Sequence, residues 1–127
     1  MSKEIKDIIL IIDDDISVRD VLVMMIEQTG YNVLGASSLK NALEQYKEKL
    51  EKDITLIMLD YSIPNENFFE TVKIINKDYS HIKLCVITGA LENSLKEKII
   101  ETSNVCKFIT KPVKIGDLQQ ILDSILQ

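Results

Sequence analysis

Short apolar runs alternate with amphipathic stretches along the whole chain. The apolar runs are rich in β-branched residues, as in strands that are buried on both faces of a sheet, and they occupy Ile8–Ile12, Tyr31–Ala36, Ile54–Leu59, Ile82–Thr88 and Val105–Thr110. Between them, apolar residues recur at helical spacing, which predicts helices over Ile16–Thr29, Ser38–Lys52, Phe68–Asn76, Leu91–Ser103 and Lys114–Leu126. This alternation predicts the α/β class, as a (βα)5 doubly wound, parallel five-stranded sheet with helices on both faces.

The first predicted helix carries signals at both ends. Asp15 stands where a side chain can cap the N-terminus. Gly30 follows the helix and suits a left-handed C′ position. Met24 and Met25, in the middle of the helix, are expected to lie in the core.

Composition bounds the possible classes of protein. A chain of 127 residues with 46% hydrophobic and 28% charged residues has the length and composition of one folded domain. The formal net charge is −5, and the sequence contains nothing that resembles the basic stripe of a protein that binds nucleic acid directly. No apolar run approaches a membrane span and no signal peptide is visible, so we expect a cytoplasmic protein without membrane insertion. Cys85 and Cys106 lack metal-ligand spacing and are expected to be reduced thiols, with a disulfide as the alternative.

Chemically reactive side chains gather where the predicted strands end. Asp13 and Asp14 follow the first strand, Asp60 follows the third, Thr88 ends the fourth, and Lys111 follows the fifth. In open parallel sheets, ligands bind beyond the carboxyl ends of the strands. We therefore expect these side chains to converge at one edge of the sheet.

The converging charges indicate a metal-dependent phosphoryl-transfer site. Like charges about 4 Å apart repel by roughly 1 kcal/mol in water and ~4 kcal/mol at an effective dielectric constant near 20. Such a pocket holds protons or a hard divalent cation, and Mg²⁺ suits carboxylates, a carbonyl and waters. Asp60 can serve as a nucleophile that needs no general base, and Thr88 and Lys111 as donors to phosphoryl oxygens.

With these residues, the chain resembles the receiver domains of two-component response regulators, including the single-domain chemotaxis type. The resemblance runs from about Ile8 to Leu126 and rests on IIDDD, LDYSIP, VITGA and FITKP, which contain the residues named above. It implies the flavodoxin-like strand order 2-1-3-4-5. It also implies one receiver domain over residues 1–127, with a core of about 8–126 and no output domain in this chain.

The resemblance assigns a role to each residue of the site. Asp60 is the phosphoacceptor; Asp14 and Asp60 ligate Mg²⁺ (or Mn²⁺) directly, with the backbone carbonyl of Ser62, and Asp13 acts through water. Thr88 and Lys111 bind the phosphoryl oxygens.

Two further features follow from the same resemblance. Phe108 matches the aromatic residue that swings inward when Thr88 moves toward the phosphoryl group. The peptide bond between Lys111 and Pro112 is expected to be cis, an isomer that only X–Pro bonds adopt at low cost.

The implied function is a signalling switch rather than a conventional enzyme. A histidine kinase or a histidine phosphotransfer protein would phosphorylate Asp60, and the domain would hydrolyse the phosphoryl group slowly. His81 does not lie on an exposed helical face, so the chain is expected to receive phosphoryl groups rather than to supply them. The fourth helix, fifth strand and fifth helix would present the signal to a downstream protein target or an output domain.

Two departures from the family pattern qualify this interpretation. Phe68 stands where the family usually has glycine, so Asn65 or Asn67 is expected to supply the left-handed backbone of the loop. Cys106 and Lys107 replace an acidic pair that transcription-factor receivers use in dimerisation. We therefore expect a monomer or a weak dimer.

Two other functions remain open at the level of the sequence. Asp13-Asp14-Asp15 also approximates the motif of haloacid-dehalogenase-type phosphatases, in which Asp13 would be the nucleophile and Asp15 the acid/base. The third hypothesis is a receiver fold that serves only for protein binding, independently of phosphorylation.

Overall fold

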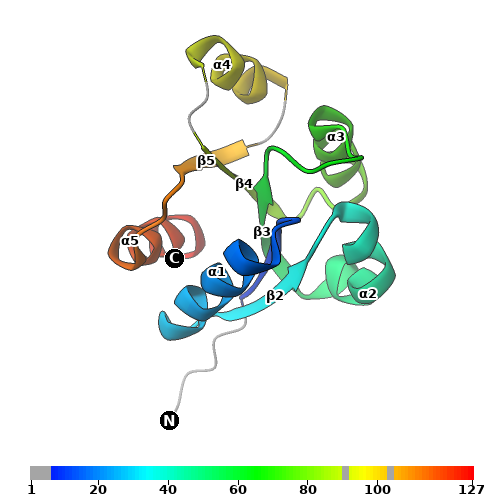
Figure 1. The fold of residues 1–127 in the computed structure, drawn as a ribbon. Coiled ribbons are helices and arrows are strands. Elements are labelled where there is room, and N and C mark those ends of the chain that lie inside the picture. Colours follow the sequence, from blue (N-terminus) through cyan, green and yellow to red (C-terminus); the bar gives the residue numbers. More distant parts are fainter. Residues whose placement is uncertain (1–6, 90–91, 103–104) are drawn as a thin grey trace.

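The computed structural model describes residues 7–89, 92–102 and 105–127 (Figure 1). Strands and helices alternate along the chain as β1 (Ile8–Ile12), α1 (Ile16–Gln28), β2 (Asn32–Ala36), α2 (Leu39–Lys52), β3 (Ile54–Asp60), α3 (Phe68–Asp78), β4 (Lys83–Thr88), α4 (Asn93–Thr102), β5 (Val105–Thr110) and α5 (Ile115–Leu126). The strands form one parallel sheet in the order β2-β1-β3-β4-β5. The predicted fold class and strand order are confirmed.

Three of the differences from the predicted element bounds are capping residues, and three strand ends differ by one residue, because β2 begins at Asn32, β3 ends at Asp60 and β4 begins at Lys83. Ser38 and Lys114 occupy the N-cap positions of α2 and α5, and Thr29 is the C-cap of α1, so these residues flank their helices. Helix α3 continues two residues beyond the predicted end at Asn76. Both predicted ends of α4, Leu91 and Ser103, lie outside the described residues.

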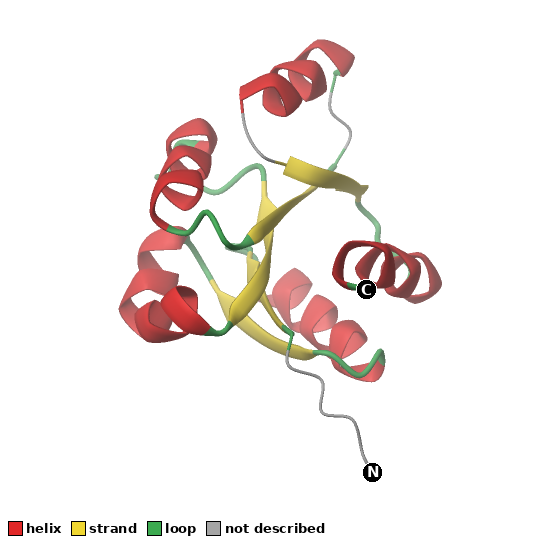
Figure 2. Ribbon diagram, turned by 180° about the vertical axis from the view of Figure 1, so that it is seen from behind, coloured by secondary structure: helices red, strands yellow, loops and turns green. Residues whose placement is uncertain are grey.

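Helices cover both faces of the sheet, as Figures 1 and 2 show from opposite sides. Helices α1 and α5 pack on one face, where Leu22 and Ile26 of α1 and Leu118 and Leu122 of α5 join one core cluster. Helices α2, α3 and α4 pack on the other face, in a cluster that includes residues such as Ile99 of α4. The three central strands are buried between these layers, which explains their continuous apolar sequences.

The expected local signals are present in the backbone. Asp15 caps α1 by accepting hydrogen bonds from the N–H groups of Ser17 and Val18. Gly30 has φ of 95° and Asn65 has φ of 66°, both in the left-handed region that these residue types tolerate. Asn67 instead caps α3 by accepting the N–H of Glu70.

Met24 is a correction to the sequence prediction, because its side chain is 60% exposed. A helix that packs against a sheet on one side buries only one stripe, which in α1 is formed by Leu22 and Ile26. Met25 is half-buried beside that stripe. Cys85 is fully buried, and the side chain of Cys106 lies outside what the structure describes.

A search of the described residues for a helix of membrane-spanning length and hydropathy finds none.

Candidate functional site

The strand register brings the predicted site residues to one edge of the sheet. Ile12 of β1 is paired with Leu59 of β3, so the next residues, Asp13 and Asp60, lie side by side. Thr88 ends the neighbouring strand β4. Thr88 also binds the start of the loop after β5, because the N–H of Lys111 donates to the Thr88 carbonyl at 2.7 Å.

The acidic residues form a compact cluster. Asp13, Asp14 and Asp60 each offer a carboxylate oxygen, and these atoms all lie within 4.8 Å of one another. Asp13 and Asp60 are buried, with exposed fractions of 2% and 8%, whereas Asp14 is exposed. The cluster therefore opens to solvent on the side of Asp14.

The Lys111 ammonium bridges the two buried carboxylates. Its Nζ lies 3.1 Å from Oδ2 of Asp13 and 3.5 Å from Oδ1 of Asp60. The ammonium balances only one of three carboxylate charges, which leaves the site with a net negative charge. The surplus favours binding of a cation from solution.

Hydrogen bonds to its backbone N–H, its carbonyl and its carboxylate hold Asp13 in place. Its N–H donates to the carbonyl of Ala36 at 3.0 Å, and its own carbonyl accepts from Nη1 of Arg19 at 2.7 Å. Its carboxylate accepts the N–H of Asp15 at 3.0 Å. The Arg19 side chain crosses Gly35 so closely that an added Cβ there would lie 3.2 Å from the Arg19 Cδ. The glycine in β2 thus leaves room for the arginine that holds Asp13.

Sequence reasoning missed the role of Arg19. The signal available was that it is the chain's one arginine and stands one turn into a helix that starts beside the acidic run. Its target is a backbone carbonyl, and side-chain patterns do not reveal such a target.

The carboxylate of Asp15 is engaged as the cap of α1. In the phosphatase alternative, Asp15 would be the acid/base. Its capping position gives that alternative no support.

Burial and neighbouring charge shift two pKa values in the site. Burial, followed by the charge of Asp13, raises the pKa of Asp60 above its usual value, and Lys111 opposes this effect only in part. Burial works against the charged form of Lys111, but the hydrogen bond to Asp13 and the charges of Asp60 and Asp13 leave its pKa raised overall. The ammonium therefore stays charged while Asp60 has excess negative charge around it.

The donor set fits a hard divalent cation. Mg²⁺ is bound in proteins by one or two carboxylates together with other oxygen ligands and waters. Three carboxylates within 4.8 Å, one of them exposed, provide such oxygens and leave access for water.

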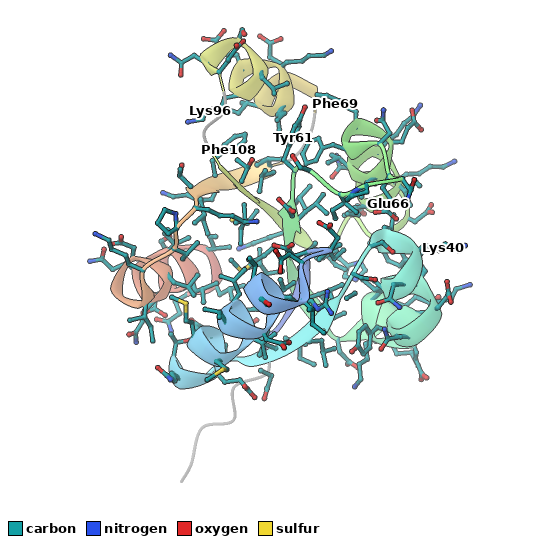
Figure 3. The ribbon with its side chains drawn as sticks, in the orientation of Figure 1. Lys40, Tyr61, Glu66, Phe69, Lys96 and Phe108 are labelled. Atoms are coloured by element: carbon teal, nitrogen blue, oxygen red, sulfur yellow. The ribbon has the colours of Figure 1, made fainter. Side chains whose placement is uncertain are left out.

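The remaining predicted residues lie around this cluster. Thr88 is buried at the end of β4, and the peptide bond between Lys111 and Pro112 is cis, as expected. Ser62 is exposed in the loop after β3, with its N–H 3.5 Å from Oδ1 of Asp60. Phe108 is half-buried in β5, where it is paired with Val86 and packs against the core on the α2–α4 side. Figure 3 shows it between β5 and α4.

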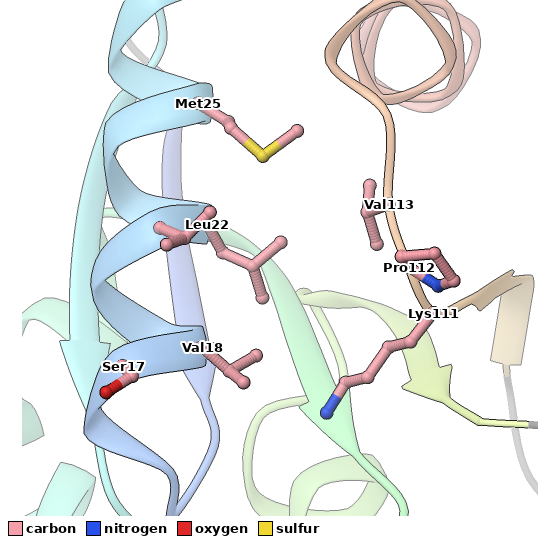
Figure 4. A pocket seen from close by; sticks show the side chains of 8 residues that line it. Ser17, Val18, Leu22, Met25, Lys111, Pro112 and Val113 are labelled. Atoms are coloured by element: carbon pink, nitrogen blue, oxygen red, sulfur yellow. The ribbon is translucent and has the colours of Figure 1, made fainter.

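An apolar pocket of about 520 Å³ adjoins the site (Figure 4). Val18, Leu22 and Met25 of α1 face Pro112 and Val113 across it. Lys111 lines the same pocket and pairs with Asp13, so the pocket lies next to the acidic cluster.

Comparisons with known proteins agree with the fold and the site described above. The family model of the response regulator receiver domain matches residues 9–123. The chain is 32% identical over 108 residues to the CAI-1 autoinducer sensor kinase/phosphatase CqsS of Vibrio cholerae, covering 82% of this chain and 15% of that protein. It is 29% identical over 118 residues to the chemotaxis protein CheY of Thermotoga maritima, covering 92% of this chain and 95% of that protein.

A solved structure agrees in fold. Chemotaxis protein CheY4 of Vibrio cholerae superimposes with a TM-score of 0.82 at 21% identity, covering 97% of this chain and all of the other. The chain spans less than a third of the length of several curated relatives that it matches, including a phosphoglycerate transport regulator of Salmonella typhimurium, of which it spans 28%. The family match covers nearly the whole described chain, and the chain belongs to the response regulator receiver domain family of two-component signalling.

Proposed function

We propose that this receiver domain is a phosphoacceptor switch in which Asp60 takes a phosphoryl group from a phosphohistidine of a histidine kinase or a histidine phosphotransfer protein. One observation carries the proposal. The buried Asp60 carboxylate lies beside two further carboxylates and 3.5 Å from an ammonium group, at the carboxyl end of a parallel sheet. This arrangement suits an anionic nucleophile and a phosphoryl group that carries negative charge.

The proposed transfer needs no proton movement at Asp60. An oxygen of its carboxylate attacks phosphorus, the P–O bond forms as the P–N bond breaks, and the imidazole nitrogen leaves with the electron pair. Lys111 donates to a phosphoryl oxygen, and Thr88 supplies a hydroxyl to another.

Asp14 and Asp60, with the backbone carbonyl of Ser62 and with Asp13 through water, would hold a Mg²⁺ or Mn²⁺ ion. Such an ion, when bound, offsets the charge that develops on the phosphoryl oxygens. Before phosphorylation, the ammonium of Lys111 lies beside Asp13 and keeps that carboxylate oriented.

The proposed output surface consists of α4, β5 and α5. Thr88 ends β4 before α4, and Lys111 follows β5, so a phosphoryl group held by both residues acts on two borders of this surface. Phe108 lies in β5 between these borders and takes the role of the moving aromatic residue. The coupling required is about 1–3 kcal/mol, which shifts the balance between two pre-existing arrangements.

The proposed partners are a protein that donates the phosphoryl group and a protein that responds to the phosphorylated domain. The apolar pocket between α1 and Pro112 offers the phosphodonor a contact surface that leads to Lys111 and Asp60. The α4–β5–α5 surface serves a downstream target or an output domain. We propose that residues 1–127 act as one receiver domain. We also propose that two copies of the chain associate weakly or not at all.

Labelling with acetyl phosphate tests the proposal. Intact-mass measurement is expected to show one added phosphoryl group with Mg²⁺ present and none with EDTA or in Asp60→Asn. Asp20→Asn, which alters an exposed acid on α1, is the matched control and should label normally. Labelling that survives EDTA or Asp60→Asn contradicts the proposal, and a label mapped to Asp13 would favour the phosphatase alternative.

A further inference from the structure

A second surface, separate from the phosphoacceptor site, lies between α3 and α4. It is a groove of about 730 Å³ whose lining includes Phe69, Val72, Lys73 and Lys77 of α3 and Lys98 of α4. The two helices are neighbours on one face of the sheet (Figure 1), and Figure 3 shows Phe69 on the side of α3 that faces α4. The floor is apolar, because Val72 is buried and Phe69 is half-buried.

The groove is basic in an acidic protein. Lys73 and Lys77 are four residues apart on α3, so their ammonium groups project from one face of the helix, and both residues are exposed. Within the part of the chain that the structure describes, neither forms an ion pair. Lys98 adds a third positive charge, and among the described residues that line the groove Glu70 is the one acid. The groove therefore carries a net positive charge, whereas the whole chain carries −5.

A row of aromatic side chains connects this groove to the phosphoacceptor. Tyr61, which follows Asp60 directly, packs on Phe68 with ring centroids 4.8 Å apart. Phe68 packs edge-on against Phe69 at 5.4 Å, and Nζ of Lys98 lies 4.9 Å above the Phe69 ring. Tyr61 and Phe69 are labelled in Figure 3, below α4.

The two helices of the groove also follow the two site residues along the chain. Helix α3 comes after the loop that follows Asp60, and α4 comes after Thr88. A change in the position of either residue would therefore act on one helix of the groove, and the packed rings from Tyr61 to Phe69 would carry a displacement of Asp60 to α3.

We propose that the α3–α4 groove binds an acidic segment of a partner protein, and that phosphorylation of Asp60 changes its affinity. An apolar side chain of the segment would lie on Phe69, and its carboxylates would meet Lys73 and Lys77. A nucleic acid suits the groove less well, because three lysines and a glutamate do not form the continuous basic stripe that a phosphate backbone needs. Binding itself does not depend on the proposed function; only its regulation through Asp60 rests on it.

A peptide titration tests the binding. The probe is a synthetic peptide of glutamates around a single leucine, and its match has glutamines in place of the glutamates. Amide NMR shifts are expected to be saturable and to cluster in residues 67–77 and 93–102. The double variant Lys73→Gln/Lys77→Gln should weaken binding about fivefold to tenfold, as expected when two charge pairs at a partly exposed surface are lost.

Matched controls decide the outcome. Lys47→Gln/Lys49→Gln makes the same change in net charge on exposed lysines of α2 and should leave the affinity unchanged. The inference is overturned if the acidic peptide does not bind at millimolar concentration. It is also overturned if both double variants reduce the affinity for that peptide equally, or if the glutamine peptide binds with the same affinity. Tighter binding of an oligo-dT strand, or self-association that the Lys73/Lys77 change abolishes, would overturn it in favour of another occupant.

The dependence on Asp60 is measured on the same samples. Beryllofluoride with Mg²⁺ is expected to change the peptide affinity severalfold, and Phe69→Leu should reduce that change while Asp60 still labels with acetyl phosphate. Unchanged affinity in protein that labels normally refutes the regulated groove but leaves the proposed function intact. Failure of Asp60 to label refutes the proposed function and leaves the peptide binding as a separate result.

Discussion

The ammonium of Lys111 lies closer to Asp13 than to Asp60, at 3.1 Å compared with 3.5 Å. The lysine is thus paired mainly with a carboxylate that is not the proposed phosphoacceptor. An added phosphoryl group on Asp60 would compete with Asp13 for this ammonium. Pairing with Asp13 holds the lysine in place before phosphorylation, and transfer of that contact to the phosphoryl group would pull on the end of β5.

Replacing Lys111 is expected to separate metal binding from signalling. Lys111→Ala removes a positive charge beside the carboxylates, so the Mg²⁺ affinity should stay the same or rise, as Coulomb repulsion of the cation is lost. The affinity for beryllofluoride should fall by about 10- to 150-fold, because a charge-assisted hydrogen bond is worth roughly 1.5–3 kcal/mol. NMR titrations with Mg²⁺, and then with beryllofluoride, measure the two effects. Lys40→Ala, at an exposed position on α2, is the control, and loss of Mg²⁺ binding in folded Lys111→Ala would show the assigned role to be wrong.

The loop after β3 is joined to the start of α2 by Glu66. Its carboxylate accepts the N–H groups of Leu39 and Lys40 at 2.9 and 3.0 Å, while Ser38 accepts that of Asn41. These bonds satisfy the backbone donors of the first turn, and the carboxylate also suits the positive end of the helix dipole. The contact fixes the loop that carries Asn65 and Asn67 to a different helix.

Removal of this contact should destabilise the fold. Glu66→Ala is expected to lower the free energy of unfolding by about 1–2 kcal/mol, the usual cost of losing a helix cap, and Glu66→Gln by about half of that. Urea denaturation measures both. Glu44→Ala, at an exposed site on α2, should lower the free energy of unfolding far less. Equal losses of stability at the two sites would contradict the capping role of Glu66.

The fold and the candidate site were both predictable from local sequence signals. Apolar periodicity predicted each strand and helix, and the parallel arrangement implied that Asp13, Asp60, Thr88 and Lys111 meet at one edge. This prediction succeeded because the strand order fixes where each residue at the carboxyl end of a strand lies along the edge of the sheet. The proximity of Asp13 and Asp60 follows from the register of β1 and β3, and Asp14 joins them from the loop after β1.

Contacts between residues distant in the chain were not predictable in this way. Glu66 and Arg19 bind backbone groups of other elements, and their partners leave no side-chain pattern in the sequence. The row from Tyr61 to Lys98 depends on how closely α3 and α4 approach each other, and periodicity does not report that distance. Met24 was misplaced because a continuous apolar run does not reveal which side of a helix faces solvent.

The C-terminal end of α5 is joined to the sheet by a tyrosine whose titration can be followed. The hydroxyl of Tyr31 donates to Oδ1 of Asp123 at 2.8 Å, and the side-chain amide of Gln127 donates to the Tyr31 oxygen at 3.2 Å. Burial, then the hydrogen bond and charge of Asp123, raise the pKa of Tyr31 above 10.0. The folded state therefore favours the protonated phenol.

This raised pKa predicts a loss of stability at alkaline pH. Between the unfolded pKa near 10 and the higher folded pKa, the folded state binds more protons, so the free energy of unfolding falls as pH rises. The stabilisation that comes from the protonated Tyr31 is complete below about pH 10 and is lost as the pH rises through the folded pKa. Tyr31→Phe lacks this titration, so the stability difference between the unaltered protein and the variant should narrow in that range. Urea denaturation at neutral pH and above pH 10 checks this, and a constant difference would contradict the contribution of Tyr31.

The route from Asp60 to the proposed output surface predicts where the structure responds. Thr88 and Lys111 border α4, β5 and α5, and the N–H of Lys111 already donates to the carbonyl of Thr88, so displacement of one moves the other. Treatment with beryllofluoride and Mg²⁺ is expected to produce large amide shifts in Thr88–Ser103 and Cys106–Lys114, beyond the residues that touch the phosphoryl mimic. Phe108→Leu, which keeps an apolar side chain but removes the ring, should leave shifts at the site and reduce those in α4, because the aromatic ring lies between β5 and that helix. Shifts confined to the site, or concentrated in Ile16–Lys52, would refute this surface as the output, and Phe108→Leu behaving as the unaltered protein would exclude the ring as its relay.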